Sequence, residues 1–168
     1  MTIYKKMVFG EKEMIILNTC KKREYLRAEN IMKFWNLLKK NGSLFLVVEA
    51  KNAFELRIEM DKLVGRDNFI NEIIVMKKSI KHKKKWAEGY RKILWFAKDF
   101  HKYIFNFGKM DRIPYMSGAG LVGEKKFKKG KTPTNVWLDI FTEKEILKRL
   151  INVHSTLISR VLILPEGK

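Results

Sequence analysis

Apolar residues in this 168-residue chain gather in short, unbroken runs. A strand with one face in water would alternate apolar with polar residues. Unbroken runs are instead typical of strands that are covered on both faces, as in a parallel sheet between two layers of helices. The runs predict strands at Met14–Leu17, Ser43–Glu49, Phe69–Met76, Lys92–Lys98 and Arg160–Leu164.

Three other segments have the spacing of amphipathic helices: Tyr25–Lys40, Lys51–Val64 and Thr142–His154. The first of them carries one apolar stripe formed by Ile31, Phe34, Trp35 and Leu38. Lys39 and Lys40 suit the last turn of that helix, and Asn41-Gly42 predicts a left-handed stop after it. Thr142 is predicted to be the N-cap of the third helix.

The alternation of strands and helices predicts an α/β domain of three layers with a mostly parallel sheet. No helix fits between the strands at 69–76 and 92–98, so we expect them to pair as an antiparallel hairpin at the sheet edge, joined by a loop at 77–89. Residues 102–107 predict a further short strand. Residues 108–131 show neither the alternation of a strand nor the spacing of an amphipathic helix. They predict an exposed, variable loop.

The charge of the chain favours a polyanionic partner. Lysine and arginine number 36 against 18 aspartate and glutamate residues, which gives a formal net charge of +18. Such an excess repels itself in a monomer, and nucleic acid is the usual compensating partner. An acidic membrane surface and a purely solvated, lysine-rich surface remain the alternatives.

Two lysine-rich segments are the strongest candidates for contact with DNA phosphates, namely the loop at 77–89 and the segment at 108–131. Trp86 and Arg91 lie beside the first cluster, where they can stack on or read bases. For any single lysine, a solvated face is the alternative. The predicted DNA contacts are Lys77, Lys78, Lys81, Lys83, Lys84, Lys85, Trp86, Arg91, Lys125, Lys126, Lys128 and Lys129.

Other classes of protein are not indicated. The apolar runs are shorter than the ~20 residues that span a bilayer, and the N-terminal residues lack the pattern of a secretory signal. Cys20 is the one cysteine, which fits a reducing compartment, so we expect a cytoplasmic protein. No histidine has cysteine or acidic neighbours at the spacing of metal ligands, so no metal site is predicted.

Over residues 41–99 these features resemble the DNA amino-methyltransferases in which the catalytic half precedes the cofactor half. The resemblance is carried by Leu37–Gly42, Ser43–Glu49, Val64–Phe69, Asn71–Lys78 and Ile93–Lys98. Such enzymes move a methyl group from S-adenosylmethionine to the exocyclic amino group of adenine or cytosine. The resemblance implies a partial, Rossmann-like methyltransferase domain over residues 1–168, with double-stranded DNA as partner and S-adenosylmethionine as cofactor.

Two downstream segments extend the resemblance. Asn135–Ile140 is similar to the family's segment after the variable loop, which implies a target-recognition role for residues 108–131. Residues 142–151 are similar to a helix start that borders the S-adenosylmethionine pocket, which implies Thr142 and Lys144 as cofactor-binding residues. An ordinary amphipathic helix is the alternative there, because Glu145 stands where the family has proline.

The two motifs that perform the chemistry in the family are not recognisable in this sequence. The catalytic loop, Asp-Pro-Pro-Tyr or a close variant, belongs after the strand at 14–17, where the chain reads Asn18-Thr19-Cys20. The glycine loop for the cofactor belongs after the strand at 160–164, where the chain reads Pro165-Glu166-Gly167-Lys168. We therefore predict no catalytic residue, and S-adenosylmethionine binding is in doubt.

Three functions compete at this point. The first is a truncated or degenerate DNA amino-methyltransferase that binds DNA and is inactive alone. The second is a non-catalytic, basic module that docks on DNA or on a second, complete methyltransferase chain. The third is an unrelated basic α/β protein that binds DNA or RNA. Cofactor binding separates the first from the other two.

Overall fold

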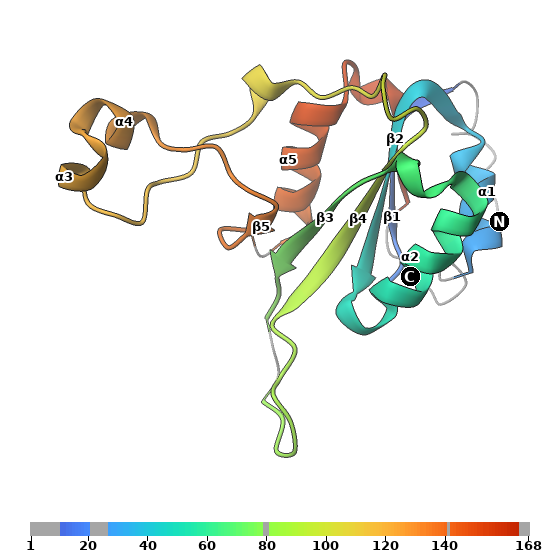
Figure 1. The fold of residues 1–168 in the computed structure, drawn as a ribbon, viewed down its shortest axis with the longest axis horizontal. Helices are drawn as coiled ribbons and strands as arrows, with labels where there is room; N and C mark the ends of the chain where they lie inside the picture. Colours follow the sequence, from blue (N-terminus) through green and yellow to red (C-terminus); the bar gives the residue numbers. More distant parts are fainter. Residues whose placement is uncertain (1–10, 21–26, 79–80, 141, 165–168) are drawn as a thin grey trace.

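The computed structural model describes residues 11–20, 27–78, 81–140 and 142–164, which form one six-stranded sheet with helices on both faces (Figure 1). The strands are β1 (Lys12–Asn18), β2 (Leu38–Glu49), β3 (Phe69–Met76), β4 (Tyr90–Ala97), β5 (Val136–Trp137) and β6 (Val161–Leu164). The helices are α1 (Ala28–Trp35), α2 (Ala50–Val64), α3 (Ala119–Val122), α4 (Glu124–Lys129) and α5 (Glu143–His154).

The sheet is mostly parallel, as the sequence predicts. Its strand order is β5-β3-β4-β2-β1-β6. β1 pairs in parallel with β2 and β6, and β3 pairs in parallel with β5. β4 is antiparallel to both of its neighbours, β2 and β3. Of the six described strands, five therefore run one way and β4 runs the other.

The antiparallel hairpin of β3 and β4 is confirmed, but it does not lie at the sheet edge. Its register runs from Phe69 opposite Phe96 to Met76 opposite Tyr90. β5 pairs on the outer side of β3, while the other side of β4 pairs with β2. The sequence could not reveal this, because a two-residue strand has too few positions to show a period.

The apolar core has two halves, one on each face of the sheet. Along β2, Leu44 and Leu46 pack into the half that α1 and α2 cover, whereas Phe45 and Val47 pack into the half that includes residues of α5. Successive strand residues point to opposite faces, so both sets are buried and the apolar run is unbroken. The prediction of strands covered on both faces is confirmed.

The two long helices begin or end at residues with a clear local reason. α2 ends at Gly65, whose φ of 90° is accessible to glycine and strained for other residues. α5 begins with a capping box, in which the Thr142 hydroxyl accepts from the N–H of Glu145 at 3.3 Å and the Glu145 carboxylate accepts from the N–H of Thr142 at 2.9 Å. The predicted N-cap is confirmed.

The first predicted helix is too long. Residues 25 and 26 lie outside the described residues, and α1 ends at Trp35. Leu38 to Asn41 instead begin β2, where Leu38 lies opposite Lys12 of β1. Gly42 is not a left-handed stop, since the described glycines with positive φ are Gly65, Gly123 and Gly130. A side chain at Gly42 would lie 2.9 Å from the Lys12 carbonyl oxygen, so glycine there allows two strands to approach.

The predicted strand at 102–107 is also wrong. These residues have no strand structure, and Phe107–Lys109 form a 3-10 turn. Their backbone is occupied elsewhere, because the N–H of Asn106 donates to the carbonyl of Val153 at the end of α5 at 2.7 Å. The N–H of Ile104 also donates to the carbonyl of Asn41 in β2 at 3.2 Å. The segment is therefore held between α5 and β2 and adds no strand to the sheet.

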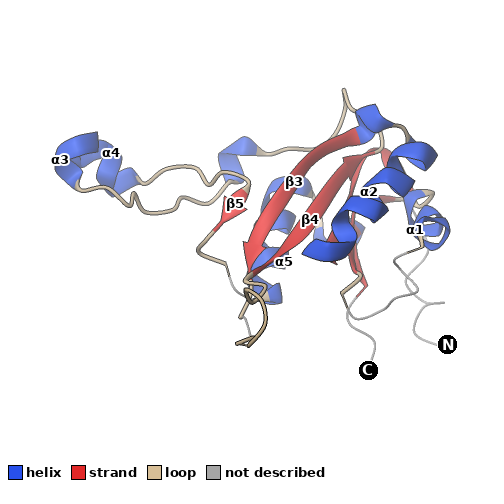
Figure 2. Ribbon diagram, turned by 60° about the horizontal axis from the view of Figure 1, so that its bottom comes forward, coloured by secondary structure: helices blue, strands red, loops and turns tan. Residues whose placement is uncertain are grey.

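Two segments project from the body of the domain. One is the basic hairpin, residues 77–89, which extends beyond the ends of β3 and β4 (Figure 1). The other is the arm, residues 110–135, which carries α3 and α4 at its far end (Figure 2). The two legs of the arm are joined at Ile113 and Lys131, whose N–H and carbonyl groups bond to each other at 2.9 Å in both directions.

Candidate functional site

The carboxyl ends of β1, β2 and β3 meet at one edge of the sheet, because these strands run the same way. The turn at Asn18–Cys20, the start of α5 and the basic hairpin all lie at this carboxyl edge. Asn18 Nδ2 donates to Glu143 Oε1 at 3.2 Å and so joins the turn to the helix. In α/β sheets ligands bind outside the carboxyl ends of the strands, which makes this edge the candidate site.

The turn after β1 fills the slot in which the resemblance places the catalytic loop. The Asn18 side-chain oxygen accepts from the N–H of Cys20 at 3.1 Å. The Thr19 hydroxyl and N–H both donate to the Val47 carbonyl, at 3.0 and 2.9 Å. Asn18 and Thr19 are only 3% and 2% exposed. The turn is therefore closed against β2 by its own polar groups.

Cys20 does not supply a nucleophile at this edge. The side chain is partly buried, and its Sγ lies 3.7 Å from the Val47 carbonyl oxygen. Burial, with a further contribution from the neighbouring Glu49 carboxylate, raises the pKa of the Cys20 thiol to about 12. Since the thiolate is the reactive form, this thiol is unreactive at neutral pH.

An ion-pair cluster fixes the root of the basic hairpin. The Lys77 ammonium donates to the carboxylate of Glu49 at the end of β2, and to Glu88 at 3.0 Å. Burial opposes the charge of Lys77, but its hydrogen bonds to both carboxylates outweigh that cost and raise the pKa of Lys77. Burial likewise opposes the charge of Glu49, and the Lys77 hydrogen bond outweighs it and lowers the pKa of Glu49.

This root contains two of the predicted DNA contacts, Lys77 and Arg91. Both side chains are partly buried. Arg91 lies opposite Glu49 in the β2–β4 pairing, and its Nε is buried with no hydrogen-bond partner among the described residues. The Lys77 ammonium is bound to the carboxylates of Glu49 and Glu88, so it must release one of them before it can bind a DNA phosphate. Their role as DNA contacts stays a prediction.

The other predicted contacts of the basic hairpin lie in water. Trp86 is 98% exposed, and the lysines that surround it in sequence are exposed as well. In the sequence of this hairpin, Glu88 is the one acidic residue. The hairpin therefore presents positive charge and one indole ring beyond the carboxyl edge. The exposed members are Lys78, Lys81, Lys83, Lys84, Lys85 and Trp86.

The second lysine cluster lies on α4, at the far end of the arm, and not in an irregular loop. Gly123, with φ of 80°, precedes this helix, and Gly130, with φ of 73°, follows it. All of the predicted contacts in the cluster are exposed, namely Lys125, Lys126, Lys128 and Lys129. The two lysine clusters thus lie on separate projections of the domain (Figure 1).

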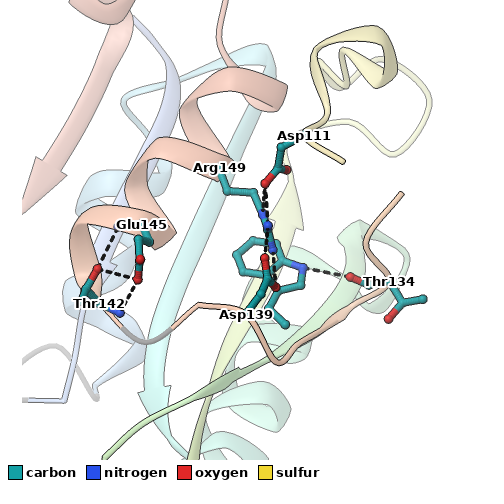
Figure 3. Close-up of polar contacts among 7 residues, drawn as sticks. Asp111, Thr134, Asp139, Thr142, Glu145 and Arg149 are labelled. Atoms are coloured by element: carbon teal, nitrogen blue, oxygen red, sulfur yellow. Dashed lines mark hydrogen bonds and ion pairs between the residues drawn. The ribbon is translucent and has the colours of Figure 1, made fainter. Parts of the chain in front are cut away.

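The residues predicted to bind the cofactor lie at the start of α5. The Thr142 hydroxyl donates to Glu145 Oε2 at 2.7 Å and accepts from the Glu145 N–H, so the capping box uses both of its functions (Figure 3). Lys144 is exposed. The start of α5 does lie at the carboxyl edge, through Glu143 and Asn18. Cofactor binding by Thr142 and Lys144 stays a prediction.

One charged cluster was not predicted from the sequence. Arg149 on α5 is 6% exposed, and its guanidinium lies between Asp111 on the outgoing leg of the arm and Asp139 after β5 (Figure 3). It donates to Asp111 at 2.9 and 2.5 Å and to Asp139 at 3.2 and 2.6 Å. Its carbon Cζ lies 5.0 Å from the centre of the Trp137 ring. Arg149 therefore fastens the base of the arm to the body.

Within residues 11–20, 27–78, 81–140 and 142–164, no helix is both long enough and apolar enough to cross a membrane. In the same part of the chain, histidine, cysteine, aspartate and glutamate side chains nowhere gather in the groups of three that a metal ion would need.

The family model for DNA methylases matches residues 18–164 of the chain. This chain belongs to the DNA amino-methyltransferase family. The match begins at Asn18, in the turn at the carboxyl edge, and ends at Leu164 in β6. It therefore covers β2 to β6, α5 and both projections of this DNA amino-methyltransferase family member, and includes only the last residue of β1. A search of curated proteins finds no match to its sequence.

Solved DNA methyltransferases have a similar fold. A crystal structure of the M1.HpyAVI–SAM complex aligns with a TM-score of 0.55 and 14% identity, over 91% of this chain and 68% of that one. A crystal structure of M1.HpyAVI gives 0.58 and 12%, with coverages of 91% and 68%. The PvuII cytosine-N4-specific DNA methyltransferase gives 0.47 and 14%, with coverages of 86% and 58%. The likeness to M1.HpyAVI shows that the mixed sheet is a methyltransferase fold.

Proposed function

We propose that this DNA amino-methyltransferase family member binds double-stranded DNA through the basic hairpin and the arm, and that it does not transfer methyl groups on its own. The observation that carries the proposal is the contrast at the carboxyl edge. There the turn at Asn18–Cys20 is closed on itself, whereas the basic hairpin that leaves the same edge is exposed and charged.

DNA binding is supported by where the charge lies. About half of the net charge of +18 lies on the two projections, and five lysines of the hairpin have exposed side chains. Each phosphate that a lysine neutralises releases condensed counterions, which drives binding without regard to sequence. The four lysines of α4 extend the charged surface along the arm. Family membership adds duplex DNA as the natural polyanion.

Lack of catalysis is supported by the hydrogen bonds of the turn. Methyl transfer requires the target nitrogen to be held in line with the methyl group, and a flipped base is read by hydrogen bonds and stacking. Here the Asn18 side chain already bonds to Cys20 and Glu143, and no aromatic side chain follows it in the turn. The turn therefore offers neither the stacking ring nor a free amide.

S-adenosylmethionine is the cofactor that the family resemblance implies. Of the two residues predicted to contact it, Thr142 has its hydroxyl engaged in the capping box and Lys144 is exposed. Cofactor binding by these two side chains stays a prediction.

The DNA-binding proposal is tested by measuring duplex affinity against salt concentration. The logarithm of affinity should fall steeply with the logarithm of salt, and replacement of Lys83, Lys84 and Lys85 by glutamine should reduce that slope by up to about three units. The control replaces three exposed lysines of α1 and α2, namely Lys33, Lys51 and Lys62. A flat salt dependence, or equal effects of the two triple variants, would contradict the proposal.

The absence of catalysis is tested by transfer of labelled methyl from S-adenosylmethionine to DNA. The purified chain should incorporate none, because the turn at Asn18–Cys20 lacks the proline and aromatic residues that would hold the base, and their loss should cost orders of magnitude in rate. Incorporation by this chain alone would show that the active site lies elsewhere. Incorporation that appears only on addition of a second chain that is itself inactive would instead favour a split enzyme. Calorimetric titration with S-adenosylmethionine reports cofactor binding separately.

A further inference from the structure

Trp86 is the most exposed of the large apolar side chains in the described residues, at 98%. All four tryptophans of the chain are described, and the other three, Trp35, Trp95 and Trp137, are each 6% exposed. Tryptophan buries more apolar surface than almost any other side chain when it contributes to a core. Trp86 contributes nothing to this core, so the ring is available to a partner.

The ring is held on a supported stem. β3 and β4 remain paired up to Met76 and Tyr90, and the N–H of Lys77 donates to the Gly89 carbonyl at 2.9 Å beyond that pair. The side chain of Lys77 then ties the stem to Glu49 of β2. Trp86 is therefore carried at a defined place beyond the carboxyl edge.

The surroundings of the ring are strongly positive. Lys83, Lys84 and Lys85 directly precede Trp86, and all three are exposed. A partner that satisfies both features needs a dense row of negative charge and, within reach of it, a flat apolar face. A nucleic-acid strand whose bases are unstacked offers both, because lysines neutralise its phosphates while aromatic side chains stack on its bases.

We infer that Trp86 stacks on an unpaired or unstacked base, so that the basic hairpin recognises opened DNA in preference to intact duplex. The inference rests on the proposed DNA-binding function and deepens it. A base inside an intact duplex is already covered on both faces, and extrusion costs free energy that is least at a mismatch or in a single strand. The lysines supply the attraction to any DNA, and Trp86 supplies the preference.

An exposed tryptophan beside lysines also suits the interface of an anionic membrane. Family membership and the second lysine cluster on the arm favour DNA. Vesicles of an anionic lipid therefore serve as a competing probe beside DNA.

The test compares three probes: a short duplex, the same duplex with one mismatch, and its single strand. Substitution of Trp86 by alanine should weaken binding to the single strand and the mismatch by about 5- to 150-fold, and binding to the intact duplex much less. Trp86→Phe should retain most of the preference. The triple change of Lys83, Lys84 and Lys85 to glutamine should lower the affinity for all three probes by similar factors, so that the order of the three affinities stays the same.

Fluorescence gives a second readout, since Trp86 is the exposed emitter and the other three tryptophans serve as an internal reference. Binding of the single strand or the mismatched duplex should quench the tryptophan fluorescence of the natural chain. The fluorescence of Trp86→Phe, which comes from the three buried tryptophans, should not change. Equal affinity of the natural chain for the three probes, or a preference that survives in Trp86→Ala, would overturn the inference while DNA binding stands. Failure of every probe to bind would instead overturn the proposed function. Emission shifted by phosphatidylserine vesicles and not by DNA would assign the ring to a membrane.

Discussion

Replacement of Arg149 by methionine is expected to lower the free energy of unfolding by about 1–3 kcal/mol. The guanidinium is 6% exposed and makes four hydrogen bonds to Asp111 and Asp139. Hydrogen bonds to charged groups contribute about 1.5–3 kcal/mol each at best. The two carboxylates are 44% and 39% exposed, however, and regain water when released, which reduces the loss. Methionine preserves the apolar stem of the side chain, so packing against Trp137 changes little.

Urea unfolding measures this loss as a lower transition midpoint with an unchanged slope. Asp111→Asn and Asp139→Asn should each lower the free energy of unfolding by less than Arg149→Met does. A double-mutant cycle of Arg149 with either aspartate should give a coupling free energy of about 0.5 kcal/mol or more. Lys148→Met is the matched control, because Lys148 is the neighbouring, exposed cation of the same helix. A cycle without coupling, or a control as damaging as Arg149→Met, would refute the assigned role of the ion pairs.

Two further predictions concern pH and the arm. Burial lowers the pKa of His154 from 6.5 to about 4, so the unfolded chain takes up a proton that the folded chain does not, and stability should fall as pH falls from 6.5 towards 4. The loss from this group approaches about 3 kcal/mol; urea unfolding at several pH values should show a larger loss of stability for the natural chain than for His154→Gln. Gly130→Ala should loosen the arm, since its φ is 73° and a Cβ would lie 2.8 Å from the Ile113 carbonyl oxygen, so the Lys131 amide should exchange faster with solvent. Gly120→Ala, which meets nothing within 4 Å, should leave that exchange unchanged.

Local pattern was sufficient to predict much of the sheet and helix layers. The unbroken apolar run of β2 reflects burial on both faces, and Thr142 with Glu145 forms the capping box that marks the start of α5. The same local logic failed at Leu38–Asn41. Lysines followed by Asn-Gly suit a helix end, but pairing with β1 supplies backbone hydrogen bonds that the local sequence does not show.

Features that depend on distant partners could not be predicted. The Lys77 ammonium is held by a carboxylate 28 residues earlier in the chain, and Arg149 binds a carboxylate 38 residues away. Neither distance leaves a periodic signal in the sequence. The position of β4 between β2 and β3 is of the same kind, since it requires knowledge of which strands lie side by side. The lysines of both clusters were identifiable as exposed because no apolar stripe accompanies them.

The two legs of the arm are joined at a neck formed by Ile113 and Lys131, so the part of the arm beyond this neck can be replaced as a unit. Ile113 and Lys131 bond to each other in both directions, so the chain leaves and re-enters the domain at nearly one point. The entropic cost of closing a loop grows only slowly with its length, and no sheet hydrogen bond lies beyond this neck. A segment of different length or charge can therefore be grafted between these two residues without disturbing the strands, and the surface that meets a partner can change while the scaffold stays constant.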